Sequence, residues 1–203
     1  MARDLDRYLP FRENGPSVLA IRRAGGPFSP EHIRTKAGFF SALVFRGVTF
    51  STEFAIQHRT LFHDLNDWNV YIQSVIDNSP SSLPATYFCK KHAYGSTTDR
   101  SVDHVQKYWE VAEEHWETMV GLDGKANSFK AFRDEIVKGK NAHGNSLYHA
   151  FGPLTGYLLT ADYAEAGLIQ IPTKEEMGDL IVDIGAGAVS ALEEMGLVRK
   201  KPS

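Results

Sequence analysis

The chain has a single cysteine, Cys89, and no long apolar run. One cysteine excludes an internal disulfide and a cysteine-rich zinc site. Residues 1–14 carry charges every few positions and have no apolar core, so they predict neither a secretory signal nor a membrane span. We therefore expect an intracellular, cytoplasmic protein with no membrane partner.

An excess of positive charge is also lacking. The 22 lysines and arginines are outnumbered by 25 aspartates and glutamates, which gives a net charge of −3, and the two signs are mixed along the chain. No segment has the basic character of a phosphate-binding surface, so we expect no nucleic-acid partner. With 203 residues, 42% of them hydrophobic, the chain can bury one substantial core, which favours a single domain.

The spacing of apolar residues predicts helices over most of the chain. Residues 1–28 contain three prolines and the Gly25-Gly26 pair, which predicts an extended N-terminal arm before a helical domain of residues 29–203. Only residues 85–89 suggest a short extended piece. The expected fold class is all-α, an irregular single-domain bundle of six or seven helices. Capping residues, periodicity and closing glycines place the main helices over 30–46, 51–79, 101–121, 127–138, 152–166 and 173–196.

The helix predicted over 51–79 carries the clearest indication of a site. Apolar residues return every three or four positions from Phe54 to Ile76, and His58 falls within this stripe. We expect His58 to be buried, because so long a stripe is typical of a central packing helix. Its imidazole either has both nitrogens satisfied within the core or serves as a general base, a metal ligand or a polar anchor in a pocket.

The His63-Asp64 dipeptide of the same helix resembles the central motif of HD-domain phosphohydrolases, which are helical metal-dependent enzymes. The resemblance implies an earlier histidine, here His32, and makes His63 and Asp64 candidate catalytic residues. The later aspartate of that pattern has three candidates in this chain, Asp99, Asp123 and Asp134. The alternative is an exposed His-Asp pair on a helix surface, and we assign no metal site.

The most polar segment of the chain is residues 141–149, directly before a predicted helix start. His143 and His149 are candidate bases, and Asn145 and Tyr148 are candidate ligand-binding residues. Loops that lead into helix N-termini often bind ligands, including anionic groups. Turn formation explains Asn145 equally well.

Residues 180–188 resemble the first motif of S-adenosylmethionine-dependent methyltransferases, in which a strand leads into a glycine turn. Thr173 and Glu176, however, form a capping box, and helical spacing continues through the glycines to Met195. We therefore predict a helix over 173–196, and no motif in the chain names a cofactor.

Two classes of function fit these observations. The first is a protein that binds or transforms a small, largely apolar molecule in an interhelical pocket. The second is a non-catalytic interaction module, including a homo-oligomer held together by an apolar helix face. The reaction and the cofactor stay unspecified, and an HD-like phosphohydrolase is a third alternative. In the first class the pocket is expected to be lined by His58 and by Trp68, Tyr108, Trp109 and Trp116.

Overall fold

The computed structural model describes residues 15–78, 85–90, 100–121, 128–185, 189–190 and 193. Within these residues the chain forms helices and no β-strand, and the only bridge joins Lys140 to Ser146. The predicted all-α bundle is confirmed. None of the described helices is long and apolar enough to cross a membrane. The elements are α2 (Pro16–Ile21), α3 (Lys36–Val44), the π-helix η2 (Phe45–Thr49), α4 (Glu53–Gln57), α5 (Leu65–Asp77), α6 (Ala85–Phe88), α7 (His104–Val120), α8 (Phe129–Lys138), α9 (Pro153–Glu165) and α10 (Lys174–Ile184).

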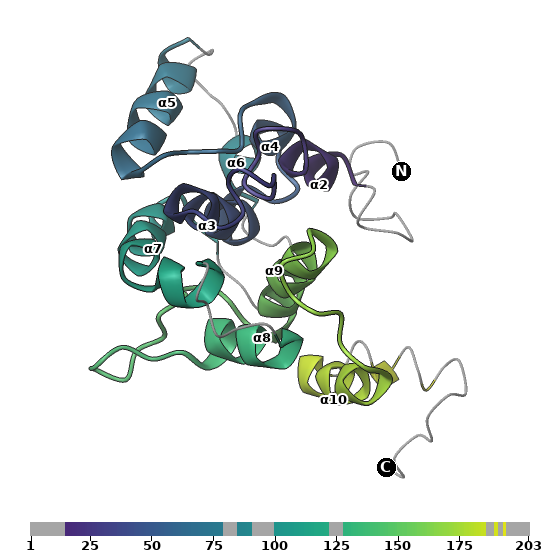
Figure 1. The fold of residues 1–203 in the computed structure, drawn as a ribbon. Helices are drawn as coiled ribbons and strands as arrows, with labels where there is room; N and C mark the ends of the chain where they lie inside the picture. The colour runs from purple at the N-terminus through teal and green to yellow at the C-terminus, as the bar shows by residue number, and fades with distance from the viewer. Residues whose placement is uncertain are drawn as a thin grey trace.

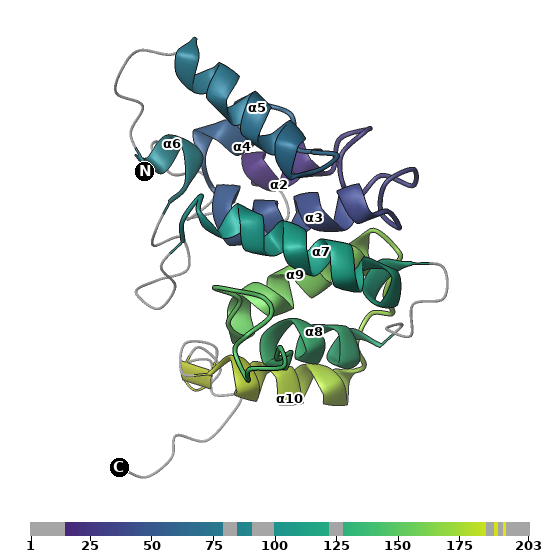
Figure 2. The same ribbon diagram turned by 90° about the vertical axis from the view of Figure 1, so that its left-hand side faces the viewer.

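The centre of the bundle is α3, which packs along α7 (Figures 1 and 2). Every residue from Gly38 to Val44 is buried, as expected for a helix that is apolar all round. The short helices α2, α4 and α6 and the longer α5 lie on one side of α3 and α7, whereas α8, α9 and α10 lie on the other. The central packing helix is thus α3, and the prediction that residues 51–79 form it is wrong.

The predicted helix over 51–79 is in fact two helices joined by an irregular segment. The helix α4 ends at Gln57, and His58 has an extended backbone with φ −114° and ψ 172°. A new helix, α5, begins only at Leu65. The intervening segment is fixed to α3, because the backbone N–H of Phe62 donates to Ser41 Oγ at 2.8 Å while the Ser41 hydroxyl donates to the Phe62 carbonyl at 3.2 Å. These long-range hydrogen bonds take the place of the helical bonds that the periodicity predicts.

The N-terminal segment also differs from the prediction. Residues 1–14 lie outside the described part of the chain, but residues 16–21 form the helix α2. Val18, Ile21 and Phe28 belong to the hydrophobic core. The part of the predicted extended arm that is described is therefore folded against the domain.

Three further helix boundaries depart from the expected ones. Residues 30–35 form turns, and α3 begins at Lys36 because the Thr35 side chain accepts the N–H of Gly38. Residues 85–88 are helical and not extended. The helix α10 starts at the predicted capping box but ends at Ile184, since Gly185 has φ +99°. Beyond Gly185 the structure describes only residues 189–190 and 193, which are helical, and the rest of the predicted helix to residue 196 lies outside the described residues.

Two buried arginines fix the π-helix that follows α3. Arg46 lies inside it and donates two hydrogen bonds to Asp162 of α9, at 2.5 and 2.6 Å. Arg100 donates to the carbonyl oxygens of Gly47 at 3.3 Å and Phe50 at 2.9 Å, and also to that of Val48. A π-turn leaves carbonyl groups without the usual helical partners, and the guanidinium of Arg100 satisfies them.

Candidate functional site

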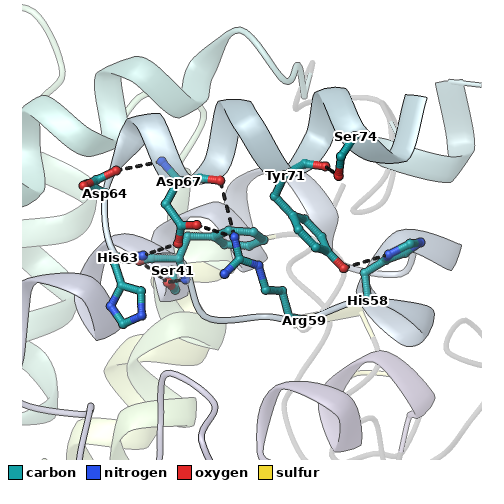
Figure 3. A network of polar contacts seen from close by, with 9 residues as sticks. Ser41, His58, Arg59, His63, Asp64, Asp67, Tyr71 and Ser74 are labelled. Atoms are coloured by element: carbon teal, nitrogen blue, oxygen red, sulfur yellow. Dashed lines mark hydrogen bonds and ion pairs between the residues drawn. The ribbon is translucent and has the colours of Figure 1, made fainter. Parts of the chain in front are cut away.

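His58 lies at the corner between α4 and α5, where its ring meets Tyr71 of α5 (Figure 3) and Tyr87 of α6. Nδ1 is 3.0 Å from the hydroxyl of Tyr71, and Nε2 is 2.5 Å from the hydroxyl of Tyr87. The Tyr87 hydroxyl also lies 3.4 Å from the Gln57 side-chain oxygen. One assignment satisfies all three contacts: Tyr71 donates to Nδ1, the Nε2–H donates to Tyr87, and Tyr87 donates to Gln57. His58 therefore joins α4 to α5 and α6.

The ring of His58 is half-buried, so the expectation of full burial is only partly met. It stacks on Phe54 with ring centres 4.9 Å apart. Burial lowers the pKa of His58, which favours the neutral ring. Burial likewise raises the pKa of Tyr87, so its hydroxyl keeps its proton at neutral pH. This arrangement matches the interpretation of His58 as an imidazole with both nitrogens satisfied.

Next to His58, Arg59 is held in place by α5 (Figure 3). Its guanidinium pairs with the carboxylate of Asp67 and lies over the ring of Tyr71, 4.3 Å from the ring centre. Asp67 also accepts the backbone N–H of His63 at 2.8 Å. Burial alone would raise the pKa of Asp67, but the hydrogen bonds from Arg59 and His63 outweigh it and hold that pKa below its usual value. The guanidinium of Arg59 is therefore held in one orientation by Asp67 and Tyr71.

The described residues give no support to the metal-binding role that the HD resemblance implies for His63 and Asp64. They lie in the irregular segment before α5, where the Asp64 carboxylate accepts the N–H of Asp67 at 2.7 Å and caps the helix. His63 is exposed. No group of three or more His, Cys, Asp or Glu side chains in the described ranges is placed to hold a metal ion, and the candidates Asp99 and Asp123 lie outside those ranges.

A hollow of about 500 Å³ opens between the turn after α2 and the segment that follows α4. Its described lining includes two arginines and two histidines but no aspartate or glutamate. Gly26 lets the turn close tightly, because a Cβ at that position would lie 2.4 Å from the carbonyl oxygen of Ile21. Gly25 has φ +76°, which favours glycine. The lining residues are Ala20, Arg23, Ala24, Gly25, Gly26, Gln57, His58, Arg59, Thr60, Leu61 and His63.

The polar segment 141–149 forms a small hairpin against α7. The Asn141 side chain accepts hydrogen bonds from the backbone N–H groups of His143 and Asn145, each at 3.0 Å. Turn formation therefore explains some of the polar residues of this segment. His143 is exposed. Asn145 and His149 line a second hollow, of about 620 Å³, together with residues of α7. Burial is the main cause that lowers the pKa of His149.

The predicted aromatic ligand-binding residues are mostly packing residues. Trp68 is buried, with its ring 4.8 Å from that of Phe62. Tyr108 is buried and donates to the carbonyl oxygen of His149 at 2.7 Å, and the ring of the buried Tyr148 lies 6.5 Å from that of Phe39. Trp109 and Trp116 are half-buried against the core. None of these residues lines the hollow beside His58.

The hollow beside His58 joins some predicted residues to others that the sequence did not suggest. It brings together His58 and His63, as predicted, but also Arg23 and Arg59. The Gly25-Gly26 pair was the one sequence signal near Arg23. Comparisons with protein-family models, with curated proteins and with solved structures find no match for this chain. Its function is therefore inferred from the geometry of its own sites.

Proposed function

We propose that this protein binds a small molecule through an anionic group, a carboxylate or a phosphate, in the hollow between residues 20–26 and 57–63. The observation that carries the proposal is the lining, in which Arg23, Arg59, His58 and His63 have no acidic residue among them. A volume of about 500 Å³ suits a small metabolite. The same lining argues against the largely apolar ligand expected from the aromatic content.

The two arginines have different roles in this proposal. Arg59 is neutralised by Asp67 and fixed over Tyr71, so it offers a rigid donor at little entropic cost. Arg23 is exposed, and its guanidinium has no acidic partner among the described residues. An oxyanion between them gains charge-assisted hydrogen bonds, and Arg23 supplies the charge that is not already compensated.

His58 is a positioning residue in this proposal. Both of its nitrogens already have tyrosine partners, so neither is free to take a proton from a ligand. By joining α4 to α5 and α6 it fixes the segment that carries Arg59. A role for His58 as a general base stays an untested prediction.

The test is a titration of the protein with inorganic phosphate, and separately with acetate, at constant ionic strength. The readout is the backbone amide resonances of Gly25 and Gly26, which line this hollow. Arg23→Gln is expected to weaken binding about ten-fold or more, the size of one charge-assisted hydrogen bond. Lys174→Gln, an equal loss of charge on the exposed side of α10, is the matched control and is expected to bind as the unchanged protein does.

Two results would refute the proposal. One is a set of Gly25 and Gly26 resonances that do not shift with either anion. The other is an equal effect of Arg23→Gln and Lys174→Gln, which would mean that net charge and not the hollow attracts the anion.

A homo-oligomer stays a prediction without specific support. The most exposed large apolar side chains of the described residues, Val70, Ile171 and Val182, are 62%, 79% and 70% exposed. They are not confined to one element, and isolated exposed apolar residues are ordinary on monomeric proteins. Light scattering after size-exclusion chromatography measures the oligomeric state directly.

A further inference from the structure

Arg133 of α8 is a buried arginine with unused donors. Its side chain is 1% exposed, and its Nη1 donates to Asp134 at 3.2 Å and to Asp183 of α10. Its Nε and Nη2 atoms are buried and have no hydrogen-bond partner in the described part of the chain. Since a guanidinium stays protonated in proteins, three charged N–H groups are without an acceptor there.

The unused atoms form the edge of the guanidinium that binds a carboxylate or a phosphate with two parallel hydrogen bonds. Arg46 uses the same edge in this protein, where Nε and Nη2 donate to the two oxygens of Asp162 at 2.5 and 2.6 Å. Buried charged donors without an acceptor are unfavourable. Arg133 therefore has the chemistry of an anion site whose bidentate edge is empty.

A hollow of about 440 Å³ lies at Arg133, between α8 and α10, which run beside one another (Figures 1 and 2). Its lining includes Lys130 and Lys138, and both of these lysines pair with the single carboxylate of Asp134, at 3.5 and 3.1 Å. Asp134 is thus shared among three cations, Arg133 included. Asp134 cannot neutralise all three of these cations, and Arg133 has a second carboxylate partner in Asp183 of α10.

The contact made by Asp183 is the weak point of this arrangement. The Asp183 side chain is 51% exposed, so water can solvate its carboxylate when it is not paired with Arg133. Leu180 is the one described α10 residue that is buried, and the helix ends at Gly185 immediately after the Asp183 turn. Asp183 can therefore leave Arg133 once another anion takes its place on the buried guanidinium.

We propose that the hollow between α8 and α10 is a second anion-binding site, in which a small carboxylate- or phosphate-bearing molecule replaces Asp183 on Arg133. The incoming oxygens take the place of Asp183 on Nη1 and reach the neighbouring Nη2, which has no hydrogen-bond partner in the described part of the chain. This site is separate from the hollow beside His58 and does not depend on it.

The experiment removes the competing carboxylate and leaves Arg133 in place. Asp183→Asn is compared with Asp179→Asn. Both aspartates lie on α10 and line the same hollow, so both variants lose the same charge, but only Asp183 pairs with Arg133. Each protein is titrated with inorganic phosphate and with acetate at constant ionic strength, and the Nε–H resonance of Arg133 is followed by NMR. Asp183→Asn is expected to bind about ten-fold more tightly than Asp179→Asn, because one charge-assisted hydrogen bond no longer competes.

Each outcome decides the proposal. Saturable shifts of the Arg133 resonance in Asp183→Asn at lower anion concentrations support it, and the anion that saturates first identifies the ligand as a carboxylate or a phosphate. Equal affinities of the two variants, or an Arg133 resonance that neither anion moves, overturn it. Far-UV circular dichroism checks that both variants keep their helical content.

Discussion

The buried ion pair between Arg46 and Asp162 offers the sharpest test of how this fold is held together. Arg46 is 4% exposed and Asp162 is 3% exposed, and two hydrogen bonds of 2.5 and 2.6 Å join them. The guanidinium also lies 5.1 Å from the ring centre of Phe45 and 4.8 Å from that of Phe50. Asp162→Asn keeps the shape of the side chain but leaves the charge of Arg46 in the core without its carboxylate.

Loss of one partner of a buried pair costs about 3–5 kcal/mol of unfolding free energy. For a chain of this length, that loss lowers Tm by about 10 °C. The assay is urea unfolding at neutral pH, followed by circular dichroism, with a thermal melt as a second measurement. The control is Glu165→Gln, which breaks the neighbouring pair with Arg22 at a side chain that is 46% exposed, and it should cost less than about 1 kcal/mol.

The reasoning is refuted if Asp162→Asn lowers the urea midpoint no more than Glu165→Gln does. That result would mean that water or a rearranged side chain compensates Arg46 as well as Asp162 does. A change in the slope of the unfolding transition would instead show a change in the compactness of the unfolded or native state, or a loss of two-state unfolding.

Three more predictions concern packing, capping and pH. Gly47→Ala places a Cβ 2.2 Å from the Tyr108 hydroxyl, so urea unfolding should show a loss of about 1–3 kcal/mol, and an unchanged midpoint would contradict this. Asp64→Ala removes the cap of α5 and should cost about 1 kcal/mol in the same assay, whereas an exposed Asp77→Ala at the other end of that helix should cost less. Because burial lowers the pKa of His58, the unfolded chain binds the proton more readily, so stability should fall as pH drops below about 6.5. His58→Gln should flatten this dependence, and an unchanged slope would speak against the assigned cause.

Capping residues, closing glycines and apolar spacing predicted those helices whose ends are set by residues close to them in the sequence. The capping box of Thr173 and Glu176 is present, with hydrogen bonds of 3.2 and 2.9 Å. The helices α7, α8 and α9 lie within one or a few residues of their predicted bounds. Such features need only residues within a turn or two of one another, so a single sequence is sufficient to find them.

The break at His58 could not be predicted in the same way. The apolar spacing from Phe54 to Ile76 suits one long helix, yet the structure ends one helix and begins another inside it. The Ser41–Phe62 hydrogen bonds that draw the segment onto α3 connect residues 21 positions apart. Periodicity does not report such contacts.

The candidate sites depended even more on tertiary structure. His58 was predicted because it falls within an apolar stripe, and His63 because of the HD resemblance. Arg23 looks like any exposed arginine until the turn after α2 meets the segment after α4. Arg133 likewise gave no signal in a charged helix, and only burial distinguishes it.

The sequence by itself determined that this chain forms an all-α bundle, because helical propensity, caps and apolar periodicity act over a few residues. Only the tertiary structure decided which helix is central, where the helix around His58 breaks and which basic side chains share a hollow. Those outcomes depend on burial and on hydrogen bonds between distant segments. The charge of an arginine is fixed by its chemistry, but whether that charge is solvated, paired or left with unused donors is set by the fold around it.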